Sequence, residues 1–122
     1  MTIPNNIEIR RNILKGLKRI VIKIGSSVIS DRNSNQEGLA RGVCEETIRQ
    51  LAIEIHHLMG RKYQITLVSS GAIMAGRNRL NLDHHHLTIP EKQACAAIGQ
   101  SFLMRSYQKA FEKHQVQVAQ IL

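Results

Sequence analysis

The chain has 122 residues, 43% of them hydrophobic, and a formal net charge of +8 at pH 7. This length limits it to a single domain, and the hydrophobic content is that of a globular protein with a core. The charge favours anionic partners, but only 3% of the residues are aromatic, too few for a nucleic-acid reader built on stacking, so nucleic acid is not an expected partner.

Several classes of protein are excluded by what the sequence lacks. No stretch is apolar for the roughly 18 residues that a membrane span needs, and charges interrupt the N-terminal region where a signal peptide has its apolar core. Cys44 and Cys95 lack a CxxC spacing and are typical of reduced core residues. We expect a cytoplasmic protein without a membrane segment. No metal site is expected either, because the adjacent residues 84–86, all histidine, indicate a polar surface loop.

The first predicted elements are a helix and a strand. Residues 7–17 have apolar side chains at helical spacing among basic ones, so we expect a short helix within a basic lead-in segment, 1–18, lying as a solvated flap over one edge of the sheet. Residues 20–24 are almost all β-branched and apolar on both faces. They predict a central strand of a parallel sheet, covered by helices on either side.

A helix and a second strand follow and complete a βαβ unit. Apolar residues recur at three- and four-residue intervals from Leu39 to Met59, which predicts a long helix with Gly60 just beyond its end. Residues 64–69 predict the second strand. Further on, 72–80 predict a short helix and 81–87 a loop.

The last predicted elements are a helix and a third strand. Thr88 and Glu91 have the capping-box spacing at the start of the helix, with Pro90 in its first turn, and Gly99 is a candidate kink. Residues 116–122 predict a third strand. Because this strand would leave an apolar edge uncovered, we expect the chain to be the front part of a longer fold.

Two of the predicted strands end in turns of small residues. Gly25, Ser26 and Ser27 follow the first strand, which contains Lys23, and residues 69–72, Ser-Ser-Gly-Ala, follow the second. A buried ammonium is costly unless an anion meets it, and ligands of open α/β sheets bind at the carboxyl ends of the strands. Backbone N–H groups and a lysine gathered there would satisfy a phosphate, so the pattern predicts a phosphoryl-transfer site.

Each half of this pattern also has a structural explanation. A lysine before a glycine can belong to an edge strand and reach solvent, and a serine after a strand is commonly a helix N-cap. Neither GxxxxGK[ST] nor GxGxxG occurs in the chain, so a phosphate site here would be of another design.

Three blocks, residues 21–28, 68–77 and 92–100, resemble the glutamate 5-kinases of the amino-acid kinase family in order and spacing. The resemblance extends from about Arg19 to Leu122. It implies an α/β fold, a parallel-rich sheet sandwiched between helices. Residues 19–122 would be the N-terminal, glutamate-binding part of the kinase domain, with the C-terminal nucleotide-binding half absent.

The implied activity is ATP-dependent phosphorylation of the γ-carboxylate of L-glutamate to γ-glutamyl phosphate, the first step of proline biosynthesis, with Mg²⁺. The resemblance also makes proline a candidate feedback inhibitor and the complete enzyme a homo-oligomer. By the same likeness, the catalytic residue is Lys23, the ATP phosphates are bound by Lys23, Gly25 and Ser26, and glutamate is held by Ser70, Gly71 and Ala72.

With half of the kinase domain missing, we expect the chain alone to have little or no activity. The alternative is a non-catalytic, truncated relative that binds glutamate or proline, or joins full-length subunits. A nucleic-acid-binding module would rest on the net charge alone.

Overall fold

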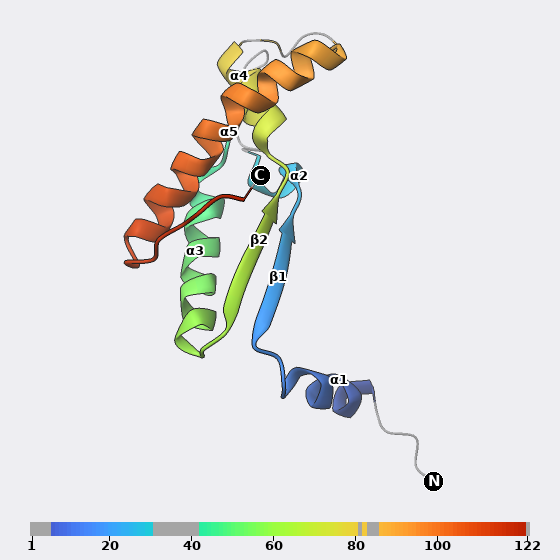
Figure 1. The fold of residues 1–122 in the computed structure, drawn as a ribbon, viewed down its shortest axis with the longest axis vertical. Coiled ribbons are helices and arrows are strands. Elements are labelled where there is room, and N and C mark those ends of the chain that lie inside the picture. The colour runs from blue at the N-terminus through green and yellow to red at the C-terminus, as the bar shows by residue number, and fades with distance from the viewer. Residues whose placement is uncertain (1–5, 31–41, 81, 83–85, 122) are drawn as a thin grey trace.

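The computed structural model describes residues 6–30, 42–80, 82 and 86–121. These residues form an α/β unit with a parallel sheet, which confirms the predicted fold class. Its elements, shown in Figure 1, are α1 (Asn6–Leu14), β1 (Arg19–Ile24), α2 (Ser26–Ile29), α3 (Glu45–Gly60), β2 (Gln64–Ser69), α4 (Ala72–Leu80) and α5 (Ile89–Glu112).

The two strands pair in parallel and end at the same level. Arg19 lies opposite Gln64 at one end of the ladder, and Ile24 lies opposite Ser69 at the other. α3 makes the connection between them, so the predicted βαβ unit is present. This register places the turns after β1 and β2 next to each other.

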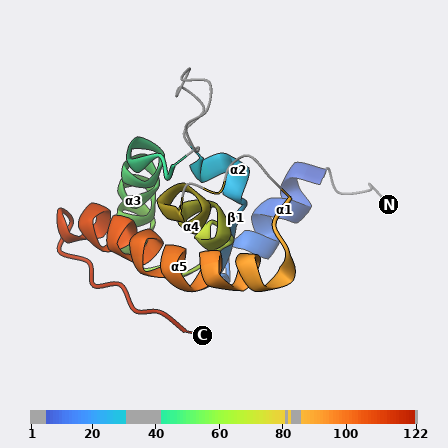
Figure 2. The same ribbon diagram turned by 90° about the horizontal axis from the view of Figure 1, so that it is seen from above.

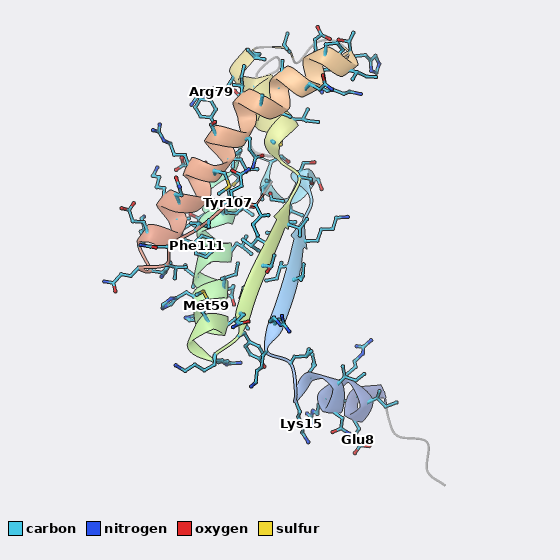
Figure 3. All side chains as sticks on the ribbon, viewed as in Figure 1. Glu8, Lys15, Met59, Arg79, Tyr107 and Phe111 are labelled. Atoms are coloured by element: carbon cyan, nitrogen blue, oxygen red, sulfur yellow. The ribbon has the colours of Figure 1, made fainter. Side chains whose placement is uncertain are left out.

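The core lies between one face of the sheet and the helices α3 and α5. Figure 3 shows Tyr107 and Phe111 on the side of α5 that faces α3 and β2. The buried residues of this core are Ile24 from β1, Ile29 from α2, Ile48, Ala52 and Ile55 from α3, and Leu103, Tyr107, Ala110 and Phe111 from α5. The spacing within α3 and α5 is that of one helical face, as the sequence pattern predicts.

The other face of the sheet is open among the described residues. Burial alternates along β1, with Val21 68% exposed and Lys23 exposed as well, and Val68 on β2 is 47% exposed. The prediction that this strand is covered on both faces, with a buried lysine, is therefore wrong for this part of the chain. β-branched residues favour a strand wherever it lies, so composition alone does not show how many faces are covered.

The predicted third strand is also wrong. The sheet described here has two strands, residues 116–121 of the predicted strand follow α5 outside it, and Leu122 lies outside the described residues. Val116 and Val118 pack against the core and, with α3, β2 and α5, line a cavity of about 570 Å³. Their apolar side chains are half-buried without the hydrogen bonds of a strand ladder.

α1 does not cover the sheet, contrary to the predicted flap. Residues 7–14 are all exposed, and Figure 1 shows the helix beyond the N-terminal end of β1, at the opposite end of the molecule from α4. Among its exposed apolar side chains are Ile7, Ile13 and Leu14. Within the residues described, no helix is long and apolar enough to cross a bilayer.

The boundaries of α3 differ slightly from the prediction. The helix begins at Glu45, and residues 39–41 of the predicted helix lie outside the described part of the chain. Gly60 is its last residue rather than the one beyond it, and the left-handed backbone conformation falls on Lys62, with φ 69°. The amides of Arg61 and Lys62 donate to the last carbonyls of the helix.

α5 begins as predicted and runs unbroken past Gly99. The side chain of Thr88 accepts from the Glu91 amide, and Glu91 accepts in turn from the Thr88 amide, so the capping box is confirmed. Gly99 is not a break in the helix but a point of close approach, because a Cβ there would collide with the backbone of Ala72 and Gly76 on α4. Figure 2 shows α4 and α5 side by side at this crossing.

Candidate functional site

The turns after β1 and β2 are hydrogen-bonded to each other. The Ser70 amide donates to the carbonyl of Ile24 over 3.3 Å, and the Ser26 amide donates to Ser70 Oγ over 3.2 Å. The Ser70 hydroxyl lies 3.5 Å from the same Ile24 carbonyl, to which it donates. One serine therefore joins the two turns of small residues that the sequence singled out, at the carboxyl end of the sheet.

Lys23 lies at this end of the sheet on the open face. It pairs in register with Val68, two residues before Ser70. Within the described residues, no hydrogen bond or ion pair engages its ammonium, which is exposed to solvent. Burial does not force an anion onto this lysine, so the case for a phosphate contact rests on its position beside the turns.

Gly25 and Ser26 begin the short helix α2. Gly25 is the N-cap residue, with φ −73° and ψ 153°, and a Cβ there would meet nothing closer than the Ser27 hydroxyl at 3.8 Å. Neither backbone angle nor space requires glycine, so a side chain would mainly restrict access to the turn. Of these two residues, both assigned to the ATP phosphates, Ser26 donates its backbone amide to Ser70 in this structure.

Gly71 and Ala72 begin α4 from the second turn. Gly71 is buried, and a Cβ at this position would require the side chain of Ile29, itself fully buried, to shift. Ala72 is the first residue of α4. The first N–H groups of a helix have no partner within it and carry a partial positive charge. The start of α4 therefore presents backbone donors where the substrate carboxylate was predicted.

Tyr107, a core residue of α5, fixes the end of β2. Its hydroxyl donates to Ser69 Oγ over 3.1 Å, next to Ser70. Burial raises the pKa of Tyr107, while its hydrogen bond with Ser69 acts in the opposite direction. The residue is a neutral donor at neutral pH. In the sequence, the signal for this contact is a tyrosine at a core position of a helix, because a buried hydroxyl requires a hydrogen-bond partner.

Two cavities of the described residues lie outside this arrangement. The apolar cavity beside β2 and a polar one of about 330 Å³ between α4 and α5 are lined by other residues, with neither Lys23 nor Ser70 among them. That Lys23 and the backbone N–H groups of the two turns bind one phosphate therefore stays a prediction. Among the described residues, no three His, Cys, Asp or Glu side chains gather as a metal site, and His84 and His85 lie outside them.

Comparison with known proteins gives the family. Residues 18–122 match the amino acid kinase family along their whole length. The chain belongs to this family. It is 43% identical over 113 residues to the glutamate 5-kinase of Citrifermentans bemidjiense, 46% over 113 to that of Geobacter metallireducens, and 44% over 115 to that of Syntrophus aciditrophicus.

These alignments cover 93–94% of this amino acid kinase chain but only 28% of each relative. The predicted resemblance to the glutamate 5-kinases is thus confirmed at the level of sequence. The chain spans less than a third of the length of these relatives.

Proposed function

We propose that this chain is the glutamate-binding part of a glutamate 5-kinase, which transfers the γ-phosphoryl group of ATP to the γ-carboxylate of L-glutamate. The observation that carries the proposal is the hydrogen-bonded pair of turns, in which the Ser26 amide meets the Ser70 hydroxyl beside Lys23. Similarity to enzymes named glutamate 5-kinase supports the substrates. The product, γ-glutamyl phosphate, would enter proline biosynthesis in the cytoplasm.

The roles of the site residues follow from the charges in the reaction. A carboxylate that attacks ATP brings negative groups together, so catalysis is mostly positioning and electrostatic stabilisation. Lys23 would offset the charge of the transferring phosphoryl group, with the amides of Gly25 and Ser26 donating to phosphate oxygens. Ser70 and the amides of Gly71 and Ala72 would hold glutamate.

Magnesium has no protein ligand in the two turns. Residues 23–27 and 68–72 contain no carboxylate, the ligand that Mg²⁺ most often takes from a protein. These residues do not fit a magnesium site of their own, and no step is derived from the ion. The proposal for this chain concerns glutamate and the phosphate contacts alone.

The domain division belongs to the proposal as well. A lead-in segment over 1–18 and a kinase part from residue 19 are supported by the family match, which begins at residue 18, and by the exposed position of α1. Homo-oligomer formation by the complete enzyme and feedback by proline are also proposed from the resemblance.

Calorimetry with L-glutamate tests the substrate half of the site. We expect the wild-type chain to bind glutamate and Ser70→Ala to bind it roughly 10- to 100-fold more weakly, the effect of removing a hydrogen bond to a charged group. Ser101→Ala is the matched control, since Ser101 is exposed on α5. Absence of binding by the wild type, or equal affinity in all three proteins, would contradict the proposal.

The same samples separate the enzyme from its alternative. Lys23→Ala should leave glutamate affinity almost unchanged and weaken binding of ATP, with exposed Lys92→Ala as the control. A non-catalytic relative that keeps only amino-acid contacts would bind glutamate or proline, and Lys23→Ala would not change its affinity for ATP. The observation that favours this second function is that the chain covers only 28% of the length of the relative from Citrifermentans bemidjiense.

A further inference from the structure

A polar cavity of about 330 Å³ lies away from the strand ends, where α4 and α5 meet the start of α3. None of the residues assigned to the proposed kinase site lines it. The lining residues that matter to its chemistry are Glu45, Arg79, Phe102, Arg105, Ser106 and Lys109. A water molecule occupies about 30 Å³ in the liquid, so the cavity has room for a small solute together with several waters.

One face of α5 supplies most of the polar groups. Phe102, Arg105, Ser106 and Lys109 are spaced by three, one and three residues, which places them along a single stripe of the helix. The aromatic ring of Phe102 carries the guanidinium of Arg79, from α4, at 3.8 Å from its centre. The stacking therefore holds Arg79 at the wall of the cavity, and Figure 3 labels this residue.

Positive charge is in excess in this cavity. Lys109 Nζ lies 2.9 Å from Glu45 Oε2, which pairs one cation with the one carboxylate of the lining. Within the described part of the chain, neither Arg79 nor Arg105 has a hydrogen-bond or ion-pair partner. Arg105 and Lys109 are four residues apart on one helix, where like charges repel. An anion between them would relieve this repulsion.

We propose that the cavity binds a phosphate group, either free or carried by a small phosphorylated molecule. Two guanidinium groups that lack a hydrogen-bond or ion-pair partner among the described residues match the geometry of phosphate oxygens, which arginine contacts through two parallel N–H groups. Ser106 adds a hydroxyl, and the excess of two positive charges corresponds to the charge of a phosphate dianion. Concave walls raise the local concentration of such an anion.

The test is a calorimetric titration of the whole chain with inorganic phosphate at physiological ionic strength. Arg105→Gln should weaken binding about tenfold, and Lys109→Gln should weaken it by a similar factor. Both positions are exposed, so neither change removes a core contact. Lys92→Gln is the matched control, because Lys92 is an exposed lysine of the same helix that does not line the cavity.

Lys23→Gln separates this inference from the proposed function. If phosphate affinity falls with Lys23→Gln and not with Arg105→Gln, the anion binds at the strand ends and the inference is wrong. Equal affinities in the Arg105, Lys109 and Lys92 variants would overturn it too, since binding would then follow net charge alone. A parallel titration with glycerol 3-phosphate shows whether the cavity prefers a phosphate ester or the free ion. The preferred form is the one that binds with the higher affinity.

Discussion

At the residue scale, Ser70 has both a structural contact and a proposed role in binding glutamate. Its hydroxyl accepts from the Ser26 amide and donates to the Ile24 carbonyl, so it holds the two turns in place. A phosphate that takes the Ser26 amide would have to replace this hydrogen bond. We therefore expect the Ser70 side chain to rotate when a ligand binds at the strand ends. Its hydroxyl can then donate a hydrogen bond to glutamate.

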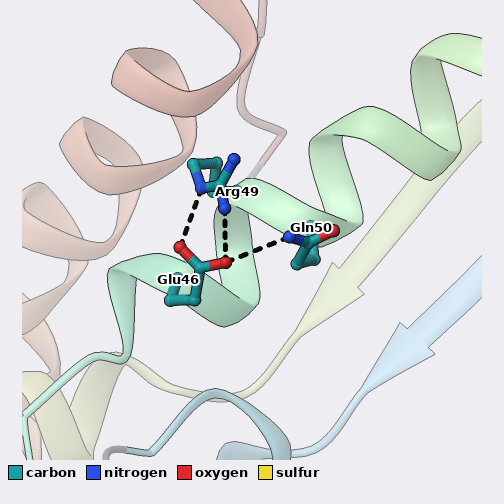
Figure 4. Close-up of polar contacts among 3 residues, drawn as sticks. All are labelled: Glu46, Arg49 and Gln50. Carbon is teal, nitrogen blue, oxygen red and sulfur yellow. Dashed lines mark hydrogen bonds and ion pairs between the residues drawn. The ribbon is translucent and has the colours of Figure 1, made fainter.

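Glu46 gives a residue-scale prediction for the pH dependence of stability. Arg49 Nε donates to Glu46 Oε2 over 2.8 Å, and the second carboxylate oxygen accepts from Arg49 and Gln50 (Figure 4). These hydrogen bonds lower the pKa of Glu46 from 4.5 to about 2. A lowered pKa stabilises the fold above the unfolded-state value, and the contribution is lost as pH falls toward the folded-state value.

Thermal unfolding of wild type and Glu46→Gln checks this. Wild type should be slightly more stable than Glu46→Gln at pH 6. This difference in stability should decrease steadily as the pH falls from about 4.5 to 2. The effect should be small because the pair is exposed and screened by solvent. Glu54→Gln, at an exposed position on the same helix, is the control. If the difference in stability between the two proteins stayed constant from pH 4.5 to pH 2, protonation of Glu46 would not be its cause.

At the scale of elements, the sequence predicts what is decided locally. The apolar stripe of α3 and the Thr88–Glu91 cap each depend on residues a few positions apart along the chain, so periodicity and spacing reveal them. Burial of Lys23 and the third strand depend on which distant segments cover or pair with a strand, and composition does not record that. The two strand-end turns were identified for the same local reason, whereas the Ser26–Ser70 hydrogen bond joins residues 44 positions apart.

The crossing of α4 and α5 gives a prediction at this scale. A Cβ at Gly99 would fall on the backbone of Ala72 and Gly76, which cannot rotate away as a side chain can. Gly99→Ala should therefore lower the free energy of unfolding by about 1–3 kcal/mol, despite the better helix propensity of alanine. Urea denaturation at constant pH measures the change.

Gly60→Ala is the matched control for this substitution. Gly60 also lies in a helix, but a Cβ added there would have nothing within 4 Å. We expect stability to stay within about 1 kcal/mol of wild type, on the stabilising side, because alanine loses less backbone entropy in a helix. If both variants lost the same stability, close packing at Gly99 would not be the cause.

At the scale of the whole molecule, the proposed site is open to water. Lys23 and Ser70 are exposed, and the face of the sheet that bears Lys23 is uncovered among the described residues. Charges in water interact several-fold more weakly than in a protein interior. Preorganised donors accelerate a reaction most where water is excluded from the site. These residues therefore have the donors of the proposed chemistry without the enclosure that makes such donors effective.

We accordingly predict that the 122 residues alone turn over ATP and glutamate at a small fraction of the rate of a glutamate 5-kinase such as that of Geobacter metallireducens, of which they match 28%. Glutamate-dependent formation of ADP, measured side by side for both proteins, checks this. Removing a single preorganised donor typically lowers a rate by about 100- to 1,000-fold, and among the described residues Lys23 and Ser70 are both exposed to water. Turnover within about tenfold of the complete enzyme, abolished by Lys23→Ala, would show instead that the strand ends suffice for catalysis.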